Sequence, residues 1–484
     1  MRARGGRYSL STFHDNTIIG QIESTDIQRV LLAYARSQAW LELLVWSAPM
    51  NLLVTNTDSP QSYAIIRALR PYADRIVVTM EGENRFLARL FSHVANSRFV
   101  DRRYYVPSPV EDWWAGNIKR ENTEKEEAFI RAVAQICEKE KIDVIFPSWD
   151  PYVYVLSKNK PLFERMGVVI PVPDHETVLM ALDKYRTIQA AQETGFPCPR
   201  TYLYEREEDL KWIAEKEGFP LVIKPRFSSG GRGMAIAKDY SELLEKLPPV
   251  LEKHGKPMIQ EYIPGRQRVS IPVLLDRNGE VRCAFQKRIH RNFRVTTGLG
   301  TVEESVLPDP HVLNSIAKLV KKSSWWGSLS VGTIRDPRDG LYKLMEINPR
   351  FPRQLWNRTE LGINEPWMCI KVARGEAVES VKDYPVGVLF VSPIDDIQLL
   401  GLQLLDLLVY KFRVSILRSA TIDRFSSPKS FNEQVQSFMQ TYLSSQKKVF
   451  DPHFRYFFQD PFVSILWWLR FSTWVLGACK QLGR

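Results

Sequence analysis

A lysine and the glycine-rich loop that follows it are the first residues of this chain that indicate chemistry. Lys224 ends a short apolar run, and the loop that follows contains Ser228, Ser229, Gly230, Gly231 and Gly233. Glycines let successive backbone N–H groups point at anionic oxygens, and a lysine supplies a compact cation. The stretch therefore predicts a strand that leads into a phosphate-binding loop, with an ordinary hairpin turn as the alternative. It contains neither the GxxxxGK[ST] nor the GxGxxG pattern.

A second candidate lies in the segment from Tyr342 to Arg350. Its apolar and polar residues alternate, which predicts a strand with Glu346, Asn348 and Arg350 on one face. Carboxylate and amide oxygens beside a guanidinium suit Mg²⁺ that is held jointly with nucleotide phosphates. Taken alone, the pattern also fits a solvent-facing strand.

The composition sets broad limits on class and partners. The chain has 484 residues, which suggests two to four domains, and a net charge of +11, which favours anionic partners. Its five cysteines lie far apart without a CxxC pair, so neither a zinc site nor a disulfide framework is predicted, and a cytoplasmic location fits best. No nucleic-acid-binding module accompanies the basic charge, and no secretory signal is evident.

The elements that must position these residues follow from periodicity. From Met50 the pattern reads strand, helix, strand, which predicts a parallel sheet with a crossover helix. A helix is expected from Asp174 to Gly195, and it contains Lys184, whose default interpretation is a solvent-exposed lysine. Further expected elements are a helix over 124–139 and strands over 142–147, 234–237, 258–263, 271–275 and 281–286.

Taken together, the motifs resemble the ATP-grasp superfamily of carboxylate–amine ligases, which includes biotin carboxylase and carbamoyl-phosphate synthetase. The resemblance rests on the lysine and glycine loop, on Gln260-Glu261-Tyr262-Ile263-Pro264-Gly265, and on Glu346-Ile347-Asn348-Pro349-Arg350, in this order. It covers roughly residues 50–381. It implies an ATP- and Mg²⁺-dependent enzyme that activates a carboxylate as an acyl phosphate and joins it to an amine.

The resemblance also implies roles for individual residues. Lys184 and Lys224 would contact the ATP phosphates, with the glycine loop as a lid. The linker Gln260 to Ile263 would receive adenine, through Glu261 and the backbone of Tyr262 and Ile263. Glu346 and Asn348 would hold Mg²⁺, Arg350 would stabilise the transferring phosphoryl group, and Arg288 would face the substrate.

Two positions depart from the family pattern. Gln267 stands where an acidic residue usually contacts ribose, and by counting Thr333 stands where a further metal ligand is expected, with Asp336 as a substitute. A hydroxyl is a weaker ligand for Mg²⁺ than a carboxylate. A nucleotide-binding regulatory or membrane-recruited scaffold protein with a degenerate site therefore remains the alternative to a working ligase.

A set of basic residues suggests that one of the two small-molecule substrates is anionic, because arginine binds carboxylates through two parallel hydrogen bonds. The alternative is a set of solvated surface side chains. The residues are Arg288, His290, Arg291, Arg294, Arg350, Arg353 and Arg358.

The C-terminal hundred residues are expected to be helical, with apolar segments at Ile397 to Phe412 and at Pro461 to Ala478. The second segment is shorter than a membrane-spanning helix and is interrupted by Arg470. Packing on the ATP-binding domain, docking of a partner protein and peripheral membrane contact through these helices are the alternatives.

The fold class expected is therefore α/β and α+β: a Rossmann-like domain that precedes an ATP-grasp domain, with a helical C-terminal region. The expected domains are an N-terminal extension at 1–49, the α/β domain at 50–173, the ATP-grasp domain at 174–381 with its lid at about 197–270, and the C-terminal region at 382–484. Residues 1–49 are either an extension or the product of a mis-assigned start.

Overall fold

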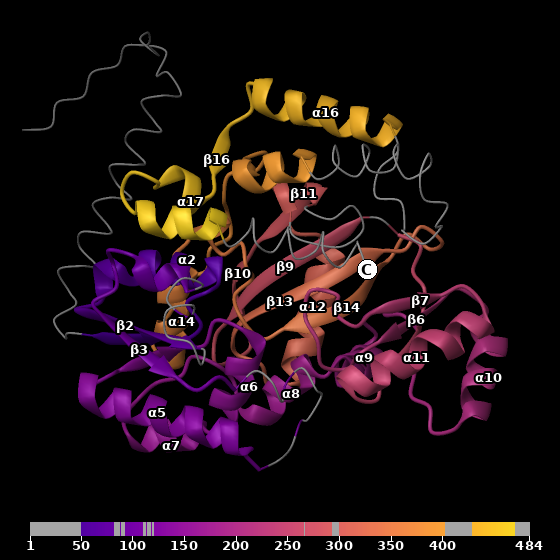
Figure 1. Ribbon diagram of the computed structural model, residues 1–484, viewed down its shortest axis with the longest axis horizontal. Coiled ribbons are helices and arrows are strands. Elements are labelled where there is room, and N and C mark those ends of the chain that lie inside the picture. Colours follow the sequence, from indigo (N-terminus) through magenta and orange to yellow (C-terminus); the bar gives the residue numbers. More distant parts are fainter. Residues whose placement is uncertain are drawn as a thin grey trace, which may run out of the picture. The chain divides into compact units, whose positions relative to one another are not determined.

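The computed structural model describes residues 50–81, 88, 92–109, 113, 118, 121–265, 267–292, 300–401 and 428–469. These residues form three β-sheets with their covering helices (Figure 1). The expected N-terminal extension, 1–49, lies outside the described residues, as do most of 397–412 and the end of 461–478.

The first sheet is parallel throughout, with strand order β3-β2-β1-β4. Its strands are β1 (Asn51–Val54), β2 (Arg75–Glu81), β3 (Arg102–Val106) and β4 (Val144–Phe146). Leu52, Leu53 and Val54 are all fully buried, as expected for a parallel sheet that helices cover on both faces. The helices of this part are α2 (Pro60–Leu69), η1 (Arg70–Tyr72), η2 (His93–Asn96), α5 (Glu124–Glu140), α6 (Asp150–Lys158) and α7 (Lys160–Arg165).

The second sheet is small and antiparallel, with strand order β5-β8-β6-β7. Its strands are β5 (Thr201–Tyr202), β6 (Leu221–Lys224), β7 (Ala235–Ala237) and β8 (Met258–Glu261). Helices α10 (Glu207–Glu217) and α11 (Tyr240–His254) contribute Ile213 and Leu243 to a core that also contains Ile223 and Ile259. One face of this sheet therefore packs against α10 and α11, and the opposite face, which carries Lys224, is not part of this core.

The third sheet is the largest, with order β14-β13-β9-β11-β12-β15-β16, and β10 pairs with β9. Helices α8 (His175–Leu182), α9 (Lys184–Thr194) and α12 (Pro310–Lys322) supply side chains to the core on one face. After β14, the chain continues with helices α13 (Trp356–Thr359) and α14 (Glu365–Ala373). The strands are β9 (Arg268–Leu275), β10 (Val281–Ala284), β11 (Gln286–Asn292), β12 (Gly300–Val306), β13 (Gly327–Arg335), β14 (Tyr342–Asn348), β15 (Leu389–Val391) and β16 (Lys448–Phe450).

The single helix expected between Asp174 and Gly195 is two helices, and the prediction was wrong on this point. Asp183 has an extended backbone (φ −82°, ψ 103°), and its side chain accepts a hydrogen bond from the Tyr185 N–H. This cap ends α8 and starts α9, so Lys184 becomes the first residue of a helix. The expected end at Gly195 is confirmed by its left-handed backbone (φ 71°).

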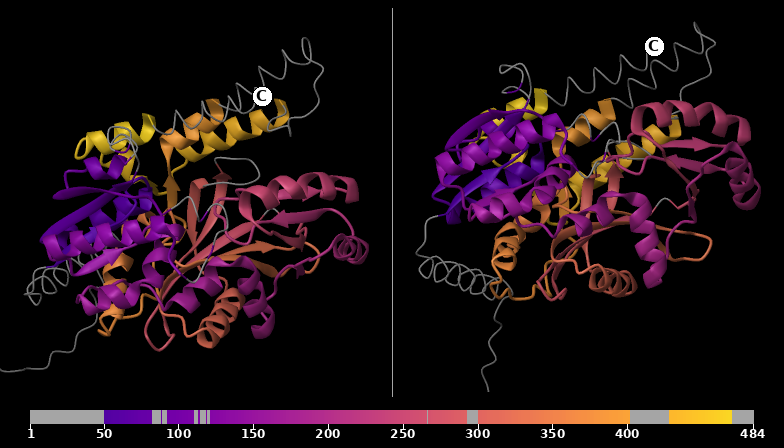
Figure 2. Two further views of the ribbon diagram at one scale, coloured as in Figure 1. Left: turned by 60° about the horizontal axis from the view of Figure 1, so that its bottom comes forward. Right: turned by 90° about the horizontal axis from the view of Figure 1, so that it is seen from below.

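The C-terminal region is mixed and not wholly helical as expected. It contains α16 (Pro428–Leu443) and α17 (Pro452–Arg455), but β15 pairs antiparallel with β12, and β16 pairs parallel with β15. The large sheet thus takes strands from both sides of residue 381. Figure 2 shows α16 beside this sheet in two further views. Within the described residues, no helix is long and apolar enough to cross a membrane.

The end of the described chain is anchored on the first sheet's elements by buried contacts. The Asp460 carboxylate accepts hydrogen bonds from the hydroxyls of Ser97 (2.5 Å) and Tyr63 (3.3 Å). Trp467 is buried and its ring stacks on His453 with centroids 5.0 Å apart. The region therefore packs on the α/β domain, and an ion pair between Arg455 and Glu360 adds a contact to the ATP-binding domain, on which packing was one of the expected alternatives.

Candidate functional site

Lys184 and Lys224 come from two different sheet systems and are both buried. Lys224 ends β6 of the small sheet, and its ammonium donates a hydrogen bond to the Met345 carbonyl of β14 (3.1 Å). Lys184 begins α9, and its ammonium donates to the carbonyl of Ser228 in the glycine loop (2.5 Å). The expected default of an exposed Lys184 is therefore wrong, and both cations point into the space between the small and the large sheet.

A β-bulge in β14 shapes the large-sheet side of the site. Gly332 pairs with Glu346 but its neighbour Thr333 pairs with Leu344, so Met345 is the extra residue. The bulge lets Leu344 and Ile347 both enter the core, while Glu346 and Asn348 lie on the opposite face. The predicted shared face of these two residues is thus present, and the bulged Met345 offers its carbonyl to Lys224.

Positive charge exceeds negative charge at the centre of the site. Burial lowers the pKa of Lys224 to about 8, and the nearby Lys184 adds to that shift although Glu346 acts against it. Burial also lowers the pKa of Lys184. Burial is the largest single influence and would raise the pKa of Glu346, but the two lysines, the hydrogen bond from Asn348 and Arg350 together outweigh it, so the net shift is downward. The carboxylate therefore stays ionised, and the lysines lack a full complement of negative charge.

Arg350 is held at the edge of this cluster by a residue that sequence reasoning missed. Its Nε and Nη2 donate to the two carboxylate oxygens of Asp150 at 2.6 and 3.0 Å. Nη2 also donates to Asn348 Oδ1 (3.3 Å), whose amide in turn donates to Glu346 (3.3 Å). Asp150 follows β4 at the carboxyl end of the parallel sheet, where ligand-binding residues gather in such sheets, and that position was the available signal.

The glycine loop connects β6 to β7 and meets α9. Gly230, Gly231 and Gly233 all have positive φ, between 64° and 72°. At Gly233 a Cβ would come within 2.4 Å of the His254 ring, so a side chain is excluded there. Ser228 and Ser229 are buried beside Lys184 and Arg232. The predicted strand leading into a glycine-rich loop is present, and the loop contacts one of the two lysines.

The predicted linker, Gln260 to Ile263, begins within β8 and presents its residues on opposite faces. Gln260 lies on the face of Lys224, away from the small-sheet core that contains Ile259. Its Nε2 donates to Thr201 Oγ1 (2.8 Å), and its Oε1 is buried and has no hydrogen-bond partner among the described residues. Tyr262 is half-exposed and Ile263 is buried. Gln260 is therefore a vacant acceptor that faces the lysines.

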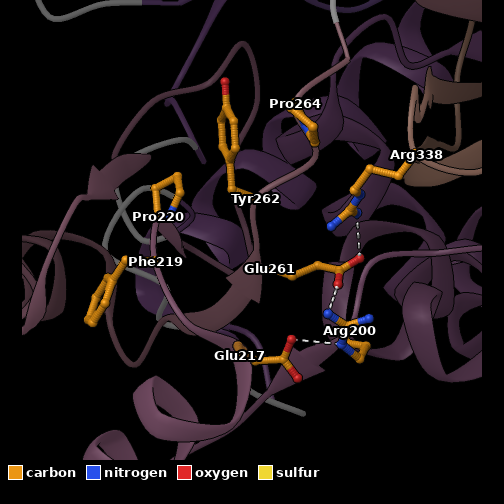
Figure 3. A pocket seen from close by; sticks show the side chains of 8 residues that line it. All are labelled: Arg200, Glu217, Phe219, Pro220, Glu261, Tyr262, Pro264 and Arg338. Carbon is orange, nitrogen blue, oxygen red and sulfur yellow. Dashed lines mark hydrogen bonds and ion pairs between the residues drawn. The ribbon is translucent and has the colours of Figure 1, made fainter.

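Glu261 points to the other face, which corrects the expectation that its side chain contacts adenine. Its carboxylate forms ion pairs with Arg200 and with Arg338 (3.4 Å). Figure 3 shows this chain of charges, with Arg200 also bound to Glu217. The group lines a cavity of about 290 Å³ that also contacts Phe219, Pro220, Tyr262 and Pro264. The cavity thus lies behind the linker, on the side away from Lys224.

Three other expected residues lie away from the cluster or make other contacts. Arg288 pairs across the sheet with Val269, and Val269 with Thr333, so Arg288 lies on the core face and bonds Glu304 (3.4 Å). The adjacent Lys287 lies on the face of Glu346 and is bound to Glu303 (2.6 Å). The Gln267 amide donates to the Tyr342 hydroxyl (3.2 Å). Strand alternation thus puts Arg288 and Thr333 on the core face, each next to a residue on the face of Glu346, and their expected roles stay predictions.

The metal site expected at Glu346 and Asn348 has one carboxylate. Gly332 is the residue opposite Glu346, Thr333 donates its hydroxyl to the Val269 carbonyl, and Asp336 is bound by Arg338. In the described part of the chain, no three His, Cys, Asp or Glu side chains lie together as a metal site would require. The residues present fit a Mg²⁺ ion only if phosphate or water oxygens complete its coordination.

Comparison with known proteins was consistent with this geometry. Residues 183–380 match the family described as carbamoyl-phosphate synthase L chain, ATP binding domain. The carbamoyl phosphate synthase large chain of Xylella fastidiosa is 26% identical over 274 residues, which cover 53% of this chain and 25% of that protein. Pyruvate carboxylase of Aspergillus niger is 25% identical over 232 residues, which cover 45% of this chain and 19% of that protein. The match thus spans a quarter or less of these two relatives.

Solved structures share the fold over a longer stretch. Biotin carboxylase of Campylobacter jejuni, in a β,γ-ATP complex, has a TM-score of 0.57 at 16% identity and covers 71% of this chain and 74% of its own. The biotin carboxylase domain of Hydrogenobacter thermophilus 2-oxoglutarate carboxylase, with MgADP and bicarbonate, has a TM-score of 0.56 at 18% identity over the same shares. The predicted α/β and α+β fold class is confirmed, and residues 183–380 match the ATP-binding domain of the carbamoyl-phosphate synthase L chain.

Proposed function

We propose that this protein is an ATP- and Mg²⁺-dependent ligase that activates a carboxylate as an acyl phosphate and joins it to an amine. The observation that carries the proposal is the buried cluster of Lys184, Lys224 and Glu346. The two buried cations share Glu346, and the nearby Asp150 and Asp183 are already paired with Arg350 and Arg226. The lysines therefore favour a polyanion, because an uncompensated buried charge is costly. The match of residues 183–380 to an ATP-binding domain identifies ATP as the polyanion.

The residues present suit phosphoryl transfer to a carboxylate. Lys224 and Lys184 would hold the phosphates as compact cations. Arg350 would bind the phosphoryl group as it passes from the nucleotide to the carboxylate oxygen and negative charge develops on the leaving ADP. Mg²⁺, bound through Glu346 and Asn348, would neutralise charge on the phosphate oxygens. The amine then attacks the acyl carbon and releases phosphate.

The same proposal includes the finer expectations on organisation and location. Residues 50–173, 174–381 and 382–484 would be the functional divisions, although the large sheet crosses the last boundary. A cytoplasmic location is supported by the free thiols of all four cysteines that the structure describes, Cys137, Cys198, Cys283 and Cys369. Both substrates would be small molecules.

Catalysis is tested by ADP release from purified protein with Mg²⁺-ATP and pools of carboxylic acids and amines. We expect release that requires an acid and an amine together, and a loss of at least about 100-fold in Lys224→Ala because a phosphate-binding cation is removed. Lys246→Ala, a surface lysine of the small-sheet unit, is the matched control. Tight nucleotide binding without release from any pool would instead favour the degenerate-site alternative.

The vacant acceptor of Gln260 makes a prediction about the base. At C6, adenine has an amino group and guanine has a carbonyl oxygen. Of these two groups, only the amino group can donate a hydrogen bond to Gln260 Oε1. Gln260→Leu should weaken ATP binding about tenfold and reduce the preference for ATP over GTP, as measured by calorimetry. Thr201→Val removes only the partner of Nε2 and should change affinity less. Equal ATP and GTP affinities in the wild-type protein would contradict this assignment.

The lowered pKa of Lys224, about 8, predicts proton uptake on binding. At pH 8.5 the free site holds Lys224 largely neutral, and a bound polyanion favours the charged form, so its pKa rises. Calorimetry of Mg²⁺-ATP binding in buffers of different ionisation enthalpy should show uptake that approaches one proton, and affinity should fall above pH 8. Lys224→Met should abolish the uptake and Lys246→Met should retain it.

We also propose a peripheral membrane contact through the C-terminal region. It is supported by exposed apolar side chains, with Phe458 94%, Phe462 69% and Leu469 55% exposed. Such side chains insert into a lipid interface in proportion to the apolar area that they bury. Phe458→Ser/Phe462→Ser should lower co-sedimentation with phosphatidylserine vesicles at least about fivefold. Leu307→Ser, 64% exposed between β12 and α12, should leave it unchanged. Absence of wild-type binding would refute the contact.

A further inference from the structure

Asp150 and Arg350 join the first sheet's elements to the ATP-grasp domain at the centre of the candidate site. They are 200 residues apart in the sequence, and their side chains are 4% and 13% exposed. Both oxygens of Asp150 are used, one by Nε and one by Nη2 of Arg350. A two-point contact of this kind fixes the plane of the guanidinium as well as its distance.

The pair determines which edge of Arg350 can meet a ligand. The Nε–Nη2 edge is taken by Asp150, and Nη2 bonds Asn348 as well. Nη1 makes a 3.3 Å bond to the Phe351 carbonyl, and its second hydrogen makes no hydrogen bond within the described residues. Nη1 is therefore the donor left for an anion next to Glu346 and Asn348.

We propose that Asp150 is a positioning residue that sets Arg350 for the phosphoryl-transfer step, an inference that rests on the proposed function. A free arginine side chain loses rotamer entropy when it binds a ligand. Asp150 removes that freedom before the ligand arrives, and donors that are already in place stabilise developing charge without rearrangement. Small displacements of such a donor reduce rates strongly. Asp150 thus contributes to the reaction without touching the substrate.

The position of Asp150 separates this role from general stabilisation of the first sheet. It follows β4 at the carboxyl end of the parallel strands, whereas Asp101 precedes β3 at their amino end and pairs with Arg70 (2.7 Å). Strand polarity places these two carboxylates at opposite edges of the same sheet. Asp101→Asn is therefore a matched control that removes a paired charge from the same sheet away from the site.

The test compares two nucleotide complexes in the full chain. The β,γ-imido analogue of ATP reports ground-state binding, and ADP with aluminium fluoride mimics the transferring phosphoryl group, both with Mg²⁺. Asp150→Asn should weaken the aluminium fluoride complex about tenfold or more, and the imido complex less than about twofold. In an Arg350→Lys background, which lacks the two-point contact, Asp150→Asn should have no further effect. Asp101→Asn should match the wild type.

Each other outcome overturns the inference in a recognisable way. Equal weakening of both complexes by Asp150→Asn would assign Asp150 a structural role, and additive effects with Arg350→Lys would remove the coupling between the two residues. If the wild-type protein binds the aluminium fluoride complex no more tightly than the imido complex, Arg350 has no role in phosphoryl transfer. The proposal that Asp150 positions it for that step would then be overturned. If the wild type binds no nucleotide, the proposed function fails as well. If Asp150→Asn does not fold, Asp150→Glu, which keeps the charge, replaces it, with an intermediate loss expected.

Discussion

The site depends on an imbalance of buried charge. Lys184 and Lys224 are both buried, and Glu346 is the carboxylate with the largest electrostatic effect on each of them. Each buried ion costs several kcal/mol unless it is compensated, so the folded chain carries this cost until an anion binds. The downward shift in the pKa of both lysines expresses the same imbalance. A polyanion resolves it, and the structure therefore selects its ligand by charge before any contact with a base or sugar.

Three separate parts of the fold must come together to create that imbalance. Lys224 belongs to the small sheet, Glu346 to the large sheet, and Asp150 to the helix after the first sheet's last strand. Their meeting is fixed by short contacts, Lys224 to the Met345 carbonyl and Asp150 to Arg350. The bulge at Met345 is essential to the first of these, because it turns a strand carbonyl out of the ladder toward the lysine. A strand without the bulge would also place Glu346 on the core face together with Leu344.

The sequence was informative where a local period determines structure. Alternation along Tyr342 to Asn348 was sufficient to group Glu346 with Asn348, and glycine spacing was sufficient to find the loop. It failed where the partner lies far away in the chain. The bulge places Gly332 opposite Glu346, where an unbroken register would place Val331, whereas counting along the chain had pointed to Thr333. Asp150 was missed because nothing near it in the sequence indicates a contact with Arg350. Strands β15 and β16 were missed because each has only three residues, too few to show a period that separates a strand from a helix.

Gly332 has a consequence for how metal and nucleotide are held. A side chain there would come within 3.2 Å of Glu346 Cγ, so the position next to the carboxylate is open only because it is glycine. With a single carboxylate and one amide, the protein offers too few oxygens to bind Mg²⁺ tightly by itself. The two lysines also repel a free divalent cation, whereas they attract a triphosphate that already carries one. The same charge imbalance that favours the polyanion therefore favours entry of the metal as part of the nucleotide complex.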